Sequence, residues 1–572
     1  MPTADPSATV LFAPSNPTPN GDLHVGHLAG PFVAADVARR CLEFRGGQGR
    51  LLLGTAWMNT HVMFAAERAG VPYPQYADLL SERIWETFRS AAVEPDVALR
   101  GADAQRIGAV VLEMLGRARE SGAVRVRTRP AHYCVGCADW RFQGYVSGSC
   151  PHCGTAGAAG IDCEACALHH DDCELVGGTC AVCGGATELR PLRRLYLLLE
   201  PLRGELAGWL AGAHLSPAAR RYADRVLARE LPEVPVSYVS ALGIAVPERP
   251  GEGVGGQSVY PAFELAGRYQ VMVEQAREAG IAPQGSPSAM FFGFDNAFER
   301  LFILPAVLLA AGTGVAPLPS YLDMSYFYRL DGAKFSTSRN HLVWARDLVA
   351  RSCADEARLY TSLTRPENNE TDFTMEEFLA SPVHGLAARL LAWAEELGAV
   401  VPRAGGADAG GSSGAGGSDA GGTDAGGAGQ LGQGPAALTA SCATWAQDLW
   451  RAYRLESFSC RSAAHALLRL VLDGQEALAL AAGAPAREAA EYRALALRVL
   501  RTVAVAGLPF LPQTCAVLRG RLGLAAQGVR WDGTLLDPAA VPGDGPAGAP
   551  ADGPGAAGAV VGPGVAGTVV AV

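Results

Sequence analysis

The stretch that decides the fold is TVLFAPSNPTPNGDLHVGH, residues 9–27. It begins with a short apolar strand at 9–12 and continues through a loop rich in proline, asparagine and glycine at 14–21. A long helical pattern then runs over 24–44, and a second apolar strand follows at 50–53. Strand, loop, helix and strand in this order predict the first unit of a doubly wound parallel sheet, an α/β fold of Rossmann type.

Two histidines, His24 and His27, stand at the start of the predicted helix, separated by a valine and a glycine. A helix N-terminus presents free backbone N–H groups and the positive end of the helix dipole, which suits a triphosphate. Paired imidazoles can donate hydrogen bonds to phosphate oxygens as charge builds at the α-phosphorus. Gly26 lets a planar adenine approach the backbone closely. We therefore predict that both histidines are catalytic and that Asn20 and Gly26 bind ATP.

A second polar motif, GAKFSTSR at 332–339, carries a single lysine, Lys334. A lysine on such a loop can neutralise the leaving pyrophosphate, so Lys334 is predicted to be catalytic. Ser336 and Ser338 of the same loop are predicted to contact ATP, which is expected to bind with Mg²⁺. Two surface histidines would explain the first motif by itself, but not both motifs in this order.

These residues resemble the HIGH and KMSKS signatures of the class I aminoacyl-tRNA synthetases. Three further segments resemble the methionyl branch, namely MFFGFDNAFERLFILPAVLL at 290–309, GIAVP at 243–247 and RLYTSLTRPENNETDF at 358–373. In the first of these, the resemblance assigns Gly293 and Asp295 to the ATP site. The likeness extends over residues 8–380, with a weaker echo in the helical remainder. It implies an ATP-dependent ligase that activates a carboxylate as its aminoacyl-adenylate.

The resemblance also implies the domain organisation, a Rossmann-type parallel sheet split by a zinc-knuckle insertion and followed by a stem-contact segment and an α-helical bundle. The expected boundaries are 1–120 for the first half of the Rossmann catalytic domain, 121–245 for the connective insertion, 246–312 for the second half, 313–375 for the stem-contact fold with the lysine loop, 376–523 for an anticodon-binding-like helical bundle and 524–572 for a disordered tail. A run of mostly Gly, Ala, Ser and Asp at 404–436 interrupts the bundle. Such a composition cannot bury a core and predicts a flexible linker.

The chain has fourteen cysteines, and eight of them form four CxxC pairs within 134–183. Metal ligation fits this spacing better than disulfides or unliganded buried cysteines. Two such pairs supply four thiolates, which make a closed tetrahedral site of the structural type, so two structural Zn²⁺ ions are expected. The resemblance implies a nested pairing, with Cys134, Cys137, Cys180 and Cys183 on one ion and Cys150, Cys153, Cys163 and Cys166 on the other.

The bulk composition excludes several classes of protein. With 49% hydrophobic and 18% charged residues, wholesale disorder is excluded. The net charge of −10 argues against sequence-independent coating of nucleic acid, although a local basic face could still hold tRNA. The first ten residues carry no secretory signal, and the sequence has no apolar stretch of about twenty residues, so a cytoplasmic protein without a membrane partner is expected.

The residues expected to bind the substrate depart from the methionyl pattern. Ala56 stands where that branch has the aspartate that pairs with the substrate's α-ammonium group. Ala262 replaces a pocket tryptophan, and Asn16 replaces an apolar residue. Glu299 and Arg300 replace the Phe-His pair that encloses the methionine side chain. The predicted substrate-binding set is Asn16, Ala56, Tyr260, Ala262, Glu264, Tyr269, Glu299 and Arg300.

A thioether needs an apolar, polarizable lining, whereas buried Asn, Glu and Arg need a polar ligand or each other. We therefore expect a polar substrate, an amino acid or another carboxylate, in place of methionine; the alternative is a Glu299–Arg300 pair that faces solvent. Two cations of the family are also absent, since Thr337 replaces the second lysine of the loop and Tyr238-Val239 replaces an Arg-Asp pair. Each lost cation could slow the reaction on the order of 10²-fold, so a slow but active adenylating enzyme is expected.

Three functions remain open. The first is an aminoacyl-tRNA ligase, methionyl or of shifted specificity. The second is a tRNA-independent ligase that passes the activated acyl group to a small molecule, and the third is a catalytically weak regulatory binding protein. The retained histidine motif and cysteine pairs favour the first two. Segment 382–397, expected to read the anticodon, has no asparagine and only one arginine, Arg389, which favours the second over the first. The helical C-terminal part favours the first.

Overall fold

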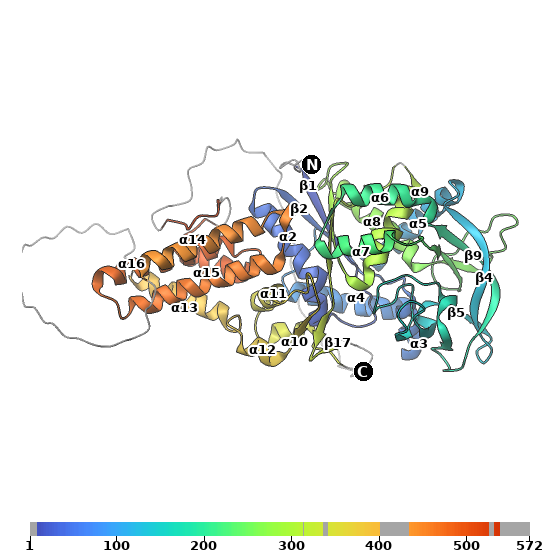
Figure 1. The fold of residues 1–572 in the computed structure, drawn as a ribbon, viewed down its shortest axis with the longest axis horizontal. Helices are drawn as coiled ribbons and strands as arrows, with labels where there is room; N and C mark the ends of the chain where they lie inside the picture. Colours follow the sequence, from blue (N-terminus) through green and yellow to red (C-terminus); the bar gives the residue numbers. More distant parts are fainter. Residues whose placement is uncertain (1–7, 313, 336–340, 401–433, 526–530, 538–572) are drawn as a thin grey trace, which may run out of the picture.

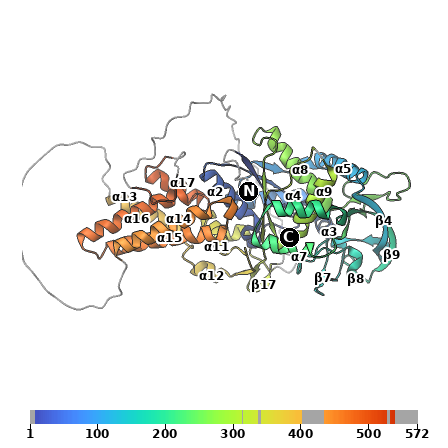
Figure 2. The same cartoon turned by 45° about the horizontal axis from the view of Figure 1, so that its top comes forward.

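The computed structural model describes residues 8–312, 314–335, 341–400, 434–525 and 531–537. The molecule is elongated, with the α/β part and its insertion at one end and a bundle of long helices at the other (Figures 1 and 2). The bundle helices are α13 (Leu386–Val400), α14 (Pro435–Ala452), α15 (Cys460–Ala481), α16 (Ala486–Ala506) and α17 (Pro512–Arg521). In the described part of the chain, no helix is both long enough and apolar enough to span a membrane.

A six-stranded parallel sheet forms the centre of the α/β part, in the order β10-β15-β14-β1-β2-β3. Its strands are β1 (Thr9–Pro14), β2 (Gln48–Gly54), β3 (Val97–Leu99), β10 (His214–Leu215), β14 (Ser288–Gly293) and β15 (Tyr321–Ser325). Every residue of β1 is buried, as expected for a parallel strand with helices on both faces of its sheet. The prediction of an α/β fold with a parallel sheet is confirmed.

The first helical stretch has three parts, α1 (Val25–His27), a π turn (Leu28–Phe32) and α2 (Val33–Phe44). The predicted start is confirmed, but the predicted continuous helix is wrong. Pro31 lies inside the π turn, and Gly30 has non-helical dihedral angles, φ −77° and ψ −111°. Proline has no N–H to donate and clashes with the preceding turn, so the helix kinks here. The Gly30 carbonyl instead accepts a hydrogen bond from Arg365 Nε at 3.2 Å.

The cysteine-rich insertion lies at the end of the molecule away from the bundle (Figure 1). Its frame is the antiparallel pair β4 (Val124–Cys134) and β9 (Glu188–Leu198). The cysteine pairs lie between and beside the short strands β5 (Asp139–Arg141), β6 (Val146–Ser149), β7 (Ala156–Ala158) and β8 (Val176–Cys180). Strand β10 falls inside the range 121–245 expected for the insertion, yet it pairs with β15 at the edge of the central sheet. The chain therefore returns to the sheet earlier than we expected.

A small three-stranded sheet carries the lysine motif, in the order β17-β16-β18. Its strands are β16 (Tyr328–Leu330), β17 (Ala333–Lys334) and β18 (Thr371–Phe373), and helices α10 (Ala345–Ala350) and α11 (Ala354–Leu363) lie beside it in the chain. Arg358 of α11 is fully buried and pairs with Asp36 of α2 at 2.6 Å. The same terminal nitrogen, Nη2, also donates to the carbonyl of Pro509 at 2.7 Å, so one guanidinium joins the nucleotide fold to the bundle.

Two regions of low sequence complexity lie largely outside the described residues. The insert expected at 404–436 is described only at 434–436, and the expected tail at 524–572 only at 524–525 and 531–537. In the last piece, Trp531 and Leu535 are buried in the core of the bundle, and Trp531 packs edge-on against Trp450. Residues 531–537 therefore pack as part of the bundle.

Candidate active site

A cavity of about 630 Å³ lies at the carboxyl ends of β1, β2, β14 and β15. Ser15 and Ala56 follow the first two strands, and Gly293 and Ser325 end the other two; all four residues line the cavity. The connections leave β1 in opposite directions, towards β2 on one side and β14 on the other. Ligands of open α/β sheets bind at such a switch point, so the cavity is the candidate active site.

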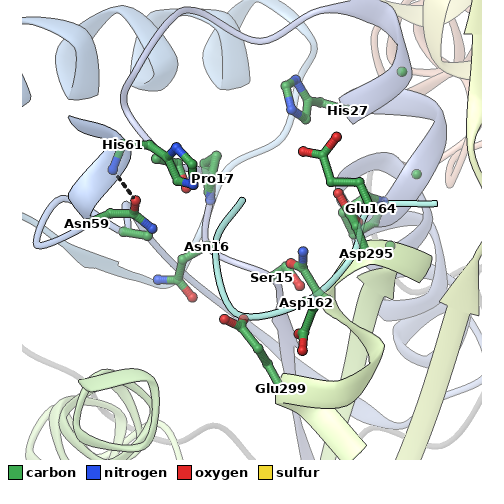
Figure 3. A pocket seen from close by; sticks show the side chains of 18 of the residues that line it. Ser15, Asn16, Pro17, His27, Asn59, His61, Asp162, Glu164, Asp295 and Glu299 are labelled. Atoms are coloured by element: carbon green, nitrogen blue, oxygen red, sulfur yellow. Dashed lines mark hydrogen bonds between the residues drawn. The ribbon is translucent and has the colours of Figure 1, made fainter. Parts of the chain in front are cut away.

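His24 and His27 both line this cavity, and Figure 3 shows His27 in its wall. Their rings stack with centroids 3.8 Å apart. The backbone N–H of His24 donates to His27 Nδ1 at 3.1 Å, so the neutral His27 ring carries its proton on Nε2. Burial lowers the pKa of His27 to about 4 and the pKa of His24 well below its usual value, with His27 and Lys334 adding to the latter shift. Near pH 7 both imidazoles are therefore neutral, and His27 Nε2–H is available as a donor.

Gly26 also lines the cavity, but the space above it is not open. A Cβ atom on Gly26 would lie 3.0 Å from His24 Nδ1 and 3.3 Å from Cδ2 of Phe335. The Phe335 ring stacks on the His24 ring at 4.7 Å. An adenine can therefore pack against Gly26, as we predicted, only if Phe335 moves aside.

Lys334 reaches the cavity from β17 and is paired there with an acidic residue of the insertion. Its Nζ lies 2.6 Å from Glu164 Oε2 and 4.5 Å from the centroid of the Phe327 ring. Asp295 lines the same region, and burial raises its pKa while Lys334 partly offsets that rise. A Cβ on Gly293 would lie 2.6 Å from Asp295 Oδ1, so a larger residue there would make the Asp295 side chain shift.

The other residues predicted to bind ATP are only partly described. Asn20 lines the cavity, beside the histidine motif. Ser336 and Ser338 lie outside the described residues.

Four of the residues predicted to bind the substrate line the cavity, namely Asn16, Ala56, Glu299 and Arg300. Asn16 is buried, and its Nδ2 donates no hydrogen bond. Arg300 is 6% exposed, and within the described chain neither Glu299 nor Arg300 makes a hydrogen bond or an ion pair. Arg300 therefore does not face solvent, whereas Glu299 is half-buried in the cavity wall. Burial raises the pKa of Glu299 to about 7, with Arg300 partly opposing, and burial lowers the pKa of Arg300 to about 10.

Three further predicted residues are not among the described side chains that line the cavity. The Tyr269 hydroxyl bonds with Ser288 Oγ at 2.7 Å and donates to the Pro317 carbonyl at 3.0 Å. Glu264 accepts from Arg268 Nη1 at 2.9 Å. Tyr260 is fully buried and packs edge-on against another tyrosine of the core. For the fourth, Ala262, the structure describes the backbone of α8 (Pro261–Glu278) but no side chain.

Several cavity residues were missed from the sequence, and the most notable is Asp162 of the insertion. Its side chain is 5% exposed, and neither carboxylate oxygen accepts a hydrogen bond. Oδ1 lies 3.5 Å from Nδ1 of His169, whose pKa burial lowers to about 4. Burial also raises the pKa of Asp162, and the charge of Asp295 adds to that rise. Nothing in the sequence around a cysteine pair indicates that its neighbour reaches a distant cavity.

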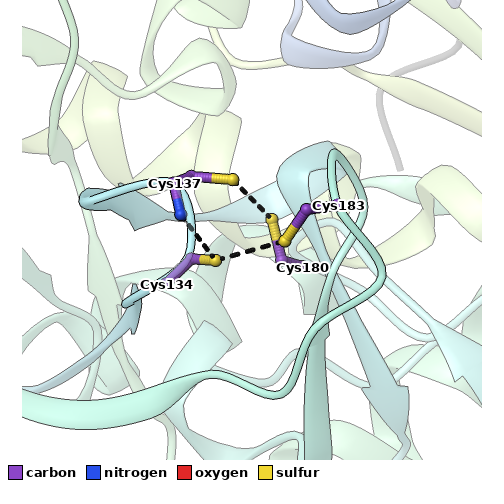
Figure 4. Close-up of side chains that lie close together, drawn as sticks. All are labelled: Cys134, Cys137, Cys180 and Cys183. Carbon is purple, nitrogen blue, oxygen red and sulfur yellow. Dashed lines mark hydrogen bonds between the residues drawn. The ribbon is translucent and has the colours of Figure 1, made fainter.

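Within the described chain, the eight cysteines of the CxxC pairs form two four-sulfur groups. The groups are Cys134, Cys137, Cys180 and Cys183 (Figure 4), and Cys150, Cys153, Cys163 and Cys166. A tetrahedral zinc with Zn–S bonds of about 2.3 Å needs sulfurs about 3.8 Å apart. Measured Sγ–Sγ distances are 3.4 and 3.8 Å in the first group and 3.9 and 3.7 Å in the second. All eight thiols are free of disulfides. The donor sets fit zinc, and the predicted nested pairing is confirmed.

The family model described as "tRNA synthetases class I (M)" matches residues 11–395 of the chain. The chain belongs to this family. As a class I tRNA synthetase of the M type, it is an adenylate-forming ligase of the aminoacyl-tRNA synthetase class. The match spans the sheet, the insertion and the lysine motif, so the cavity lies wholly within the family domain.

Relatives of this class I tRNA synthetase chain support the assignment. A methionine–tRNA ligase of Bacillus cereus (strain AH187) is 28% identical over 375 residues, which cover 64% of this chain and 68% of the relative. A methionine–tRNA ligase of Kineococcus radiotolerans is 30% identical over 393 residues, covering 64% and 65%. A solved structure of Mycobacterium tuberculosis methionyl-tRNA synthetase in complex with methionyl-adenylate has the same fold, with a TM-score of 0.66, 18% identity, and 91% and 94% of the two chains covered.

Proposed function

We propose that the protein uses ATP to activate an amino acid as its aminoacyl-adenylate in the cavity beside His27. The observation that carries the proposal is the fixed tautomer of that ring. Because Nδ1 accepts the backbone N–H of His24 at 3.1 Å, the Nε2–H can donate to a phosphate oxygen without any change of protonation. Lys334 supplies the one ammonium group among the described cavity residues, where a triphosphate with its Mg²⁺ needs positive charge.

In the proposed reaction, a carboxylate oxygen of the substrate attacks the α-phosphorus of ATP. A new P–O bond forms as the bond to the bridging oxygen breaks, and pyrophosphate leaves with the electron pair of that bond. His27 and His24 hold the oxygens of the α-phosphate as their negative charge grows. Lys334 stabilises the leaving pyrophosphate after it exchanges Glu164 for a phosphate oxygen. Loss of one such donor costs about 10²- to 10³-fold in rate.

We further propose that the substrate is polar and is not methionine. Support comes from the lining, where Asn16, Glu299 and Arg300 present polar atoms to the cavity without hydrogen-bond partners. A thioether cannot satisfy these groups, and leaving them desolvated would cost binding energy. A side chain with its own donors and acceptors could satisfy all three.

An ATP–pyrophosphate exchange assay with each of the twenty standard amino acids tests both proposals. We expect exchange to be fastest with a polar amino acid, and His27→Ala to slow it about 10²-fold or more. Asp448→Asn, a residue of the bundle outside the cavity lining that pairs with Arg451, is the control and should match the wild type. Fastest exchange with methionine would overturn the proposal that the substrate is polar. No exchange with any amino acid would overturn the adenylation itself.

The acceptor of the activated group is proposed to be tRNA, on the strength of the retained helical bundle. One observation favours the tRNA-independent ligase as a second candidate. Arg389 is the single arginine of segment 382–397, and its guanidinium donates to the carbonyls of Pro382 and His384 at the start of its own helix. It is therefore occupied and cannot read a base without giving up these bonds. Aminoacylation of total tRNA by the full chain, using the amino acid found by exchange, decides between the two acceptors.

We also propose that each cysteine group holds one structural Zn²⁺. Four thiolates leave no open position for water, so the ions stabilise the insertion and take no part in bond making. Metal analysis of the purified protein should give two zinc ions per chain. Cys150→Ser should lower the content to one, and Cys41→Ser, a buried cysteine outside both groups, should leave it at two. One zinc in the wild type would contradict the proposal.

A further inference from the structure

The insertion contributes a side chain to the cavity that no described protein group satisfies. Asp162 directly precedes Cys163, and its residue is 8% exposed. Both carboxylate oxygens are buried without a hydrogen bond, and the polar contact at Oδ1 is to His169 Nδ1 at 3.5 Å. Desolvating a carboxylate is costly unless a charge or several hydrogen bonds compensate. A ligand that brings a cation into the cavity would supply that compensation.

A second carboxylate stands at the same end of the cavity. Figure 3 shows Asp162 and Glu299 at one end, with His27 and Glu164 at the other. Glu299 comes from the π turn Glu299–Ile303 that leads into α9 (Leu304–Ala311). It has no hydrogen bond or ion pair in the described chain; Arg300 and Arg268 act on it electrostatically in favour of its charged form, and Asp162 and Asp295 act against that form. The two side chains come from segments far apart in the sequence, so only the fold brings them together.

Two of the three arginine and lysine side chains described in the cavity lining are already paired with carboxylates of the protein. Arg268 is paired with Glu264 at 2.9 Å, and Lys334 with Glu164 at 2.6 Å. Among the described arginines and lysines that line the cavity, Arg300 alone makes no ion pair. One guanidinium therefore stands against the carboxylates of Asp162, Glu299 and Asp295. The cavity is short of positive charge, which favours a ligand that brings a cation.

We infer that Asp162, with Glu299 beside it, binds the ammonium group of the amino-acid substrate. Ala56 lines the same cavity and has only a methyl group at the position where the resembled branch carries its ammonium-binding aspartate. An ammonium has three N–H donors, enough to reach two carboxylates at once. The segment that carries the group of Cys150, Cys153, Cys163 and Cys166 thereby supplies part of the substrate site. This inference rests on the proposed adenylation function and names its substrate as one that carries a basic nitrogen.

Matched substrate pairs test the inference in the zinc-loaded full chain. ATP–pyrophosphate exchange is measured with L-glutamine and 4-carbamoylbutanoate, L-lysine and 6-aminohexanoate, and L-methionine and 4-(methylthio)butanoate, plus the fastest of the twenty amino acids and its des-amino analogue. In each pair the second compound lacks only the α-amino group. For the fastest amino acid we expect at least about 30-fold lower kcat/KM without that group, the loss typical of an unpaired buried charge.

Variants then locate the ammonium site. Asp162→Asn should raise the KM for the amino acid about 30-fold or more while the KM for ATP is unchanged. It should also shrink the difference between amino acid and des-amino analogue. The double variant Asp162→Asn with Ala56→Asp should recover most of the loss, because it returns a carboxylate to the cavity. Asp139→Asn, two residues after Cys137 of the other cysteine group and outside the cavity lining, is the matched control and should behave as wild type.

Because Asp162 adjoins a cysteine ligand, zinc content is measured for every variant. If Asp162→Asn loses zinc, Glu299→Gln decides in its place; an unchanged amino-acid KM in that variant would overturn the inference. Equal exchange with the des-amino analogue would also overturn it, while leaving the proposed adenylation intact. Absence of exchange with every compound would instead overturn the proposed function, and the inference with it.

Discussion

Two clusters of carboxylates and arginines in this molecule differ in whether the protein itself supplies hydrogen-bond and ion-pair partners for the charged groups. At the junction of α2, α11 and the bundle, Asp36 contacts Arg39, Arg40 and Arg358 at 2.6–2.8 Å. In the cavity, Asp162, Glu299 and Arg300 are also buried or lie in the cavity wall, yet none of them makes a hydrogen bond in the described chain. Buried charges that have partners within the protein connect parts of the structure. Buried charges that have no such partner indicate a ligand-binding site.

The pKa values express the same contrast. Burial raises the pKa of Asp36, but the three arginines around it more than offset that effect and bring it to about 2. Burial raises the pKa of Glu299 to about 7, and Arg300 offsets only part of the rise. The fold therefore stabilises the charged form of Asp36, whereas the charged form of Glu299 lacks a sufficient opposite charge nearby.

The largest expected effect comes from breaking the satisfied cluster. Arg358→Met leaves Asp36 buried with a partner removed, and it frees the carbonyls of Ala91, Ala92 and Pro509 that Arg358 now contacts. We expect a loss of about 3–5 kcal/mol in the free energy of unfolding, measured by urea denaturation. A loss below about 1 kcal/mol would show that this cluster does not hold the bundle to the nucleotide fold.

The equivalent change in the cavity should have the opposite sign. Arg300→Met removes a buried charge that has no ion-pair partner among the described residues, so the free energy of unfolding should rise by about 1–2 kcal/mol. Amino-acid-dependent exchange should fall in the same variant, since a polar contact to the substrate is lost. Destabilisation comparable to that of Arg358→Met would mean that Arg300 has a structural role and would remove the contrast between the clusters.

The pH dependence of stability separates the two carboxylates. Glu299 has a raised pKa, so the folded state binds more protons than the unfolded one between pH of about 4.3 and 7, and its contribution falls as pH rises through that window. Asp36 has a lowered pKa, so its contribution is lost as pH falls from about 4 towards 2. Thermal unfolding of Glu299→Gln should lack the first dependence and keep the second. Identical pH profiles for wild type and Glu299→Gln would contradict the assignment.

The smallest effect is expected at the Lys334–Glu164 pair in the cavity lining. Glu164→Gln removes the partner of Lys334, but the Glu164 side chain is 70% exposed, so the free energy of unfolding should change by at most about 1 kcal/mol. The rate of exchange should not fall, because Lys334 no longer has to leave a carboxylate to reach pyrophosphate. A large loss of exchange would show that Glu164 itself contributes to the reaction.

Local patterns predicted the parts of the molecule that local chemistry determines. The apolar strands at 9–12 and 50–53 became β1 and β2, and the histidine motif lies in the cavity as expected. The cysteine pairing followed from the family resemblance, and the sulfur distances agree with it. Even the kink at Pro31 was available from the sequence, since a proline inside a helical pattern interrupts it.

What sequence reasoning missed depends on contacts between distant segments. Asp162 lines the cavity together with residues that end or follow the strands of the sheet, and no pattern around Cys163 carries that information. Phe335 fills the space above Gly26 because its ring, directly after β17, stacks on His24. Tyr269 was assigned to the substrate by alignment alone, whereas its hydroxyl is committed to Ser288 and Pro317 inside the core.

The carbonyl at the Gly30 kink is connected to the bundle through a chain of side-chain contacts that begins at Arg365. Arg365, which donates to the Gly30 carbonyl, also pairs with Asp323 of β15 at 2.5 Å and with Glu367 at 3.3 Å. Glu367 in turn accepts from Ser459 Oγ at 2.6 Å, immediately before α15 begins. Movement of the start of α15 relative to the sheet would therefore disturb the contacts of Arg365, one of which is to the carbonyl of Gly30 in the cavity lining.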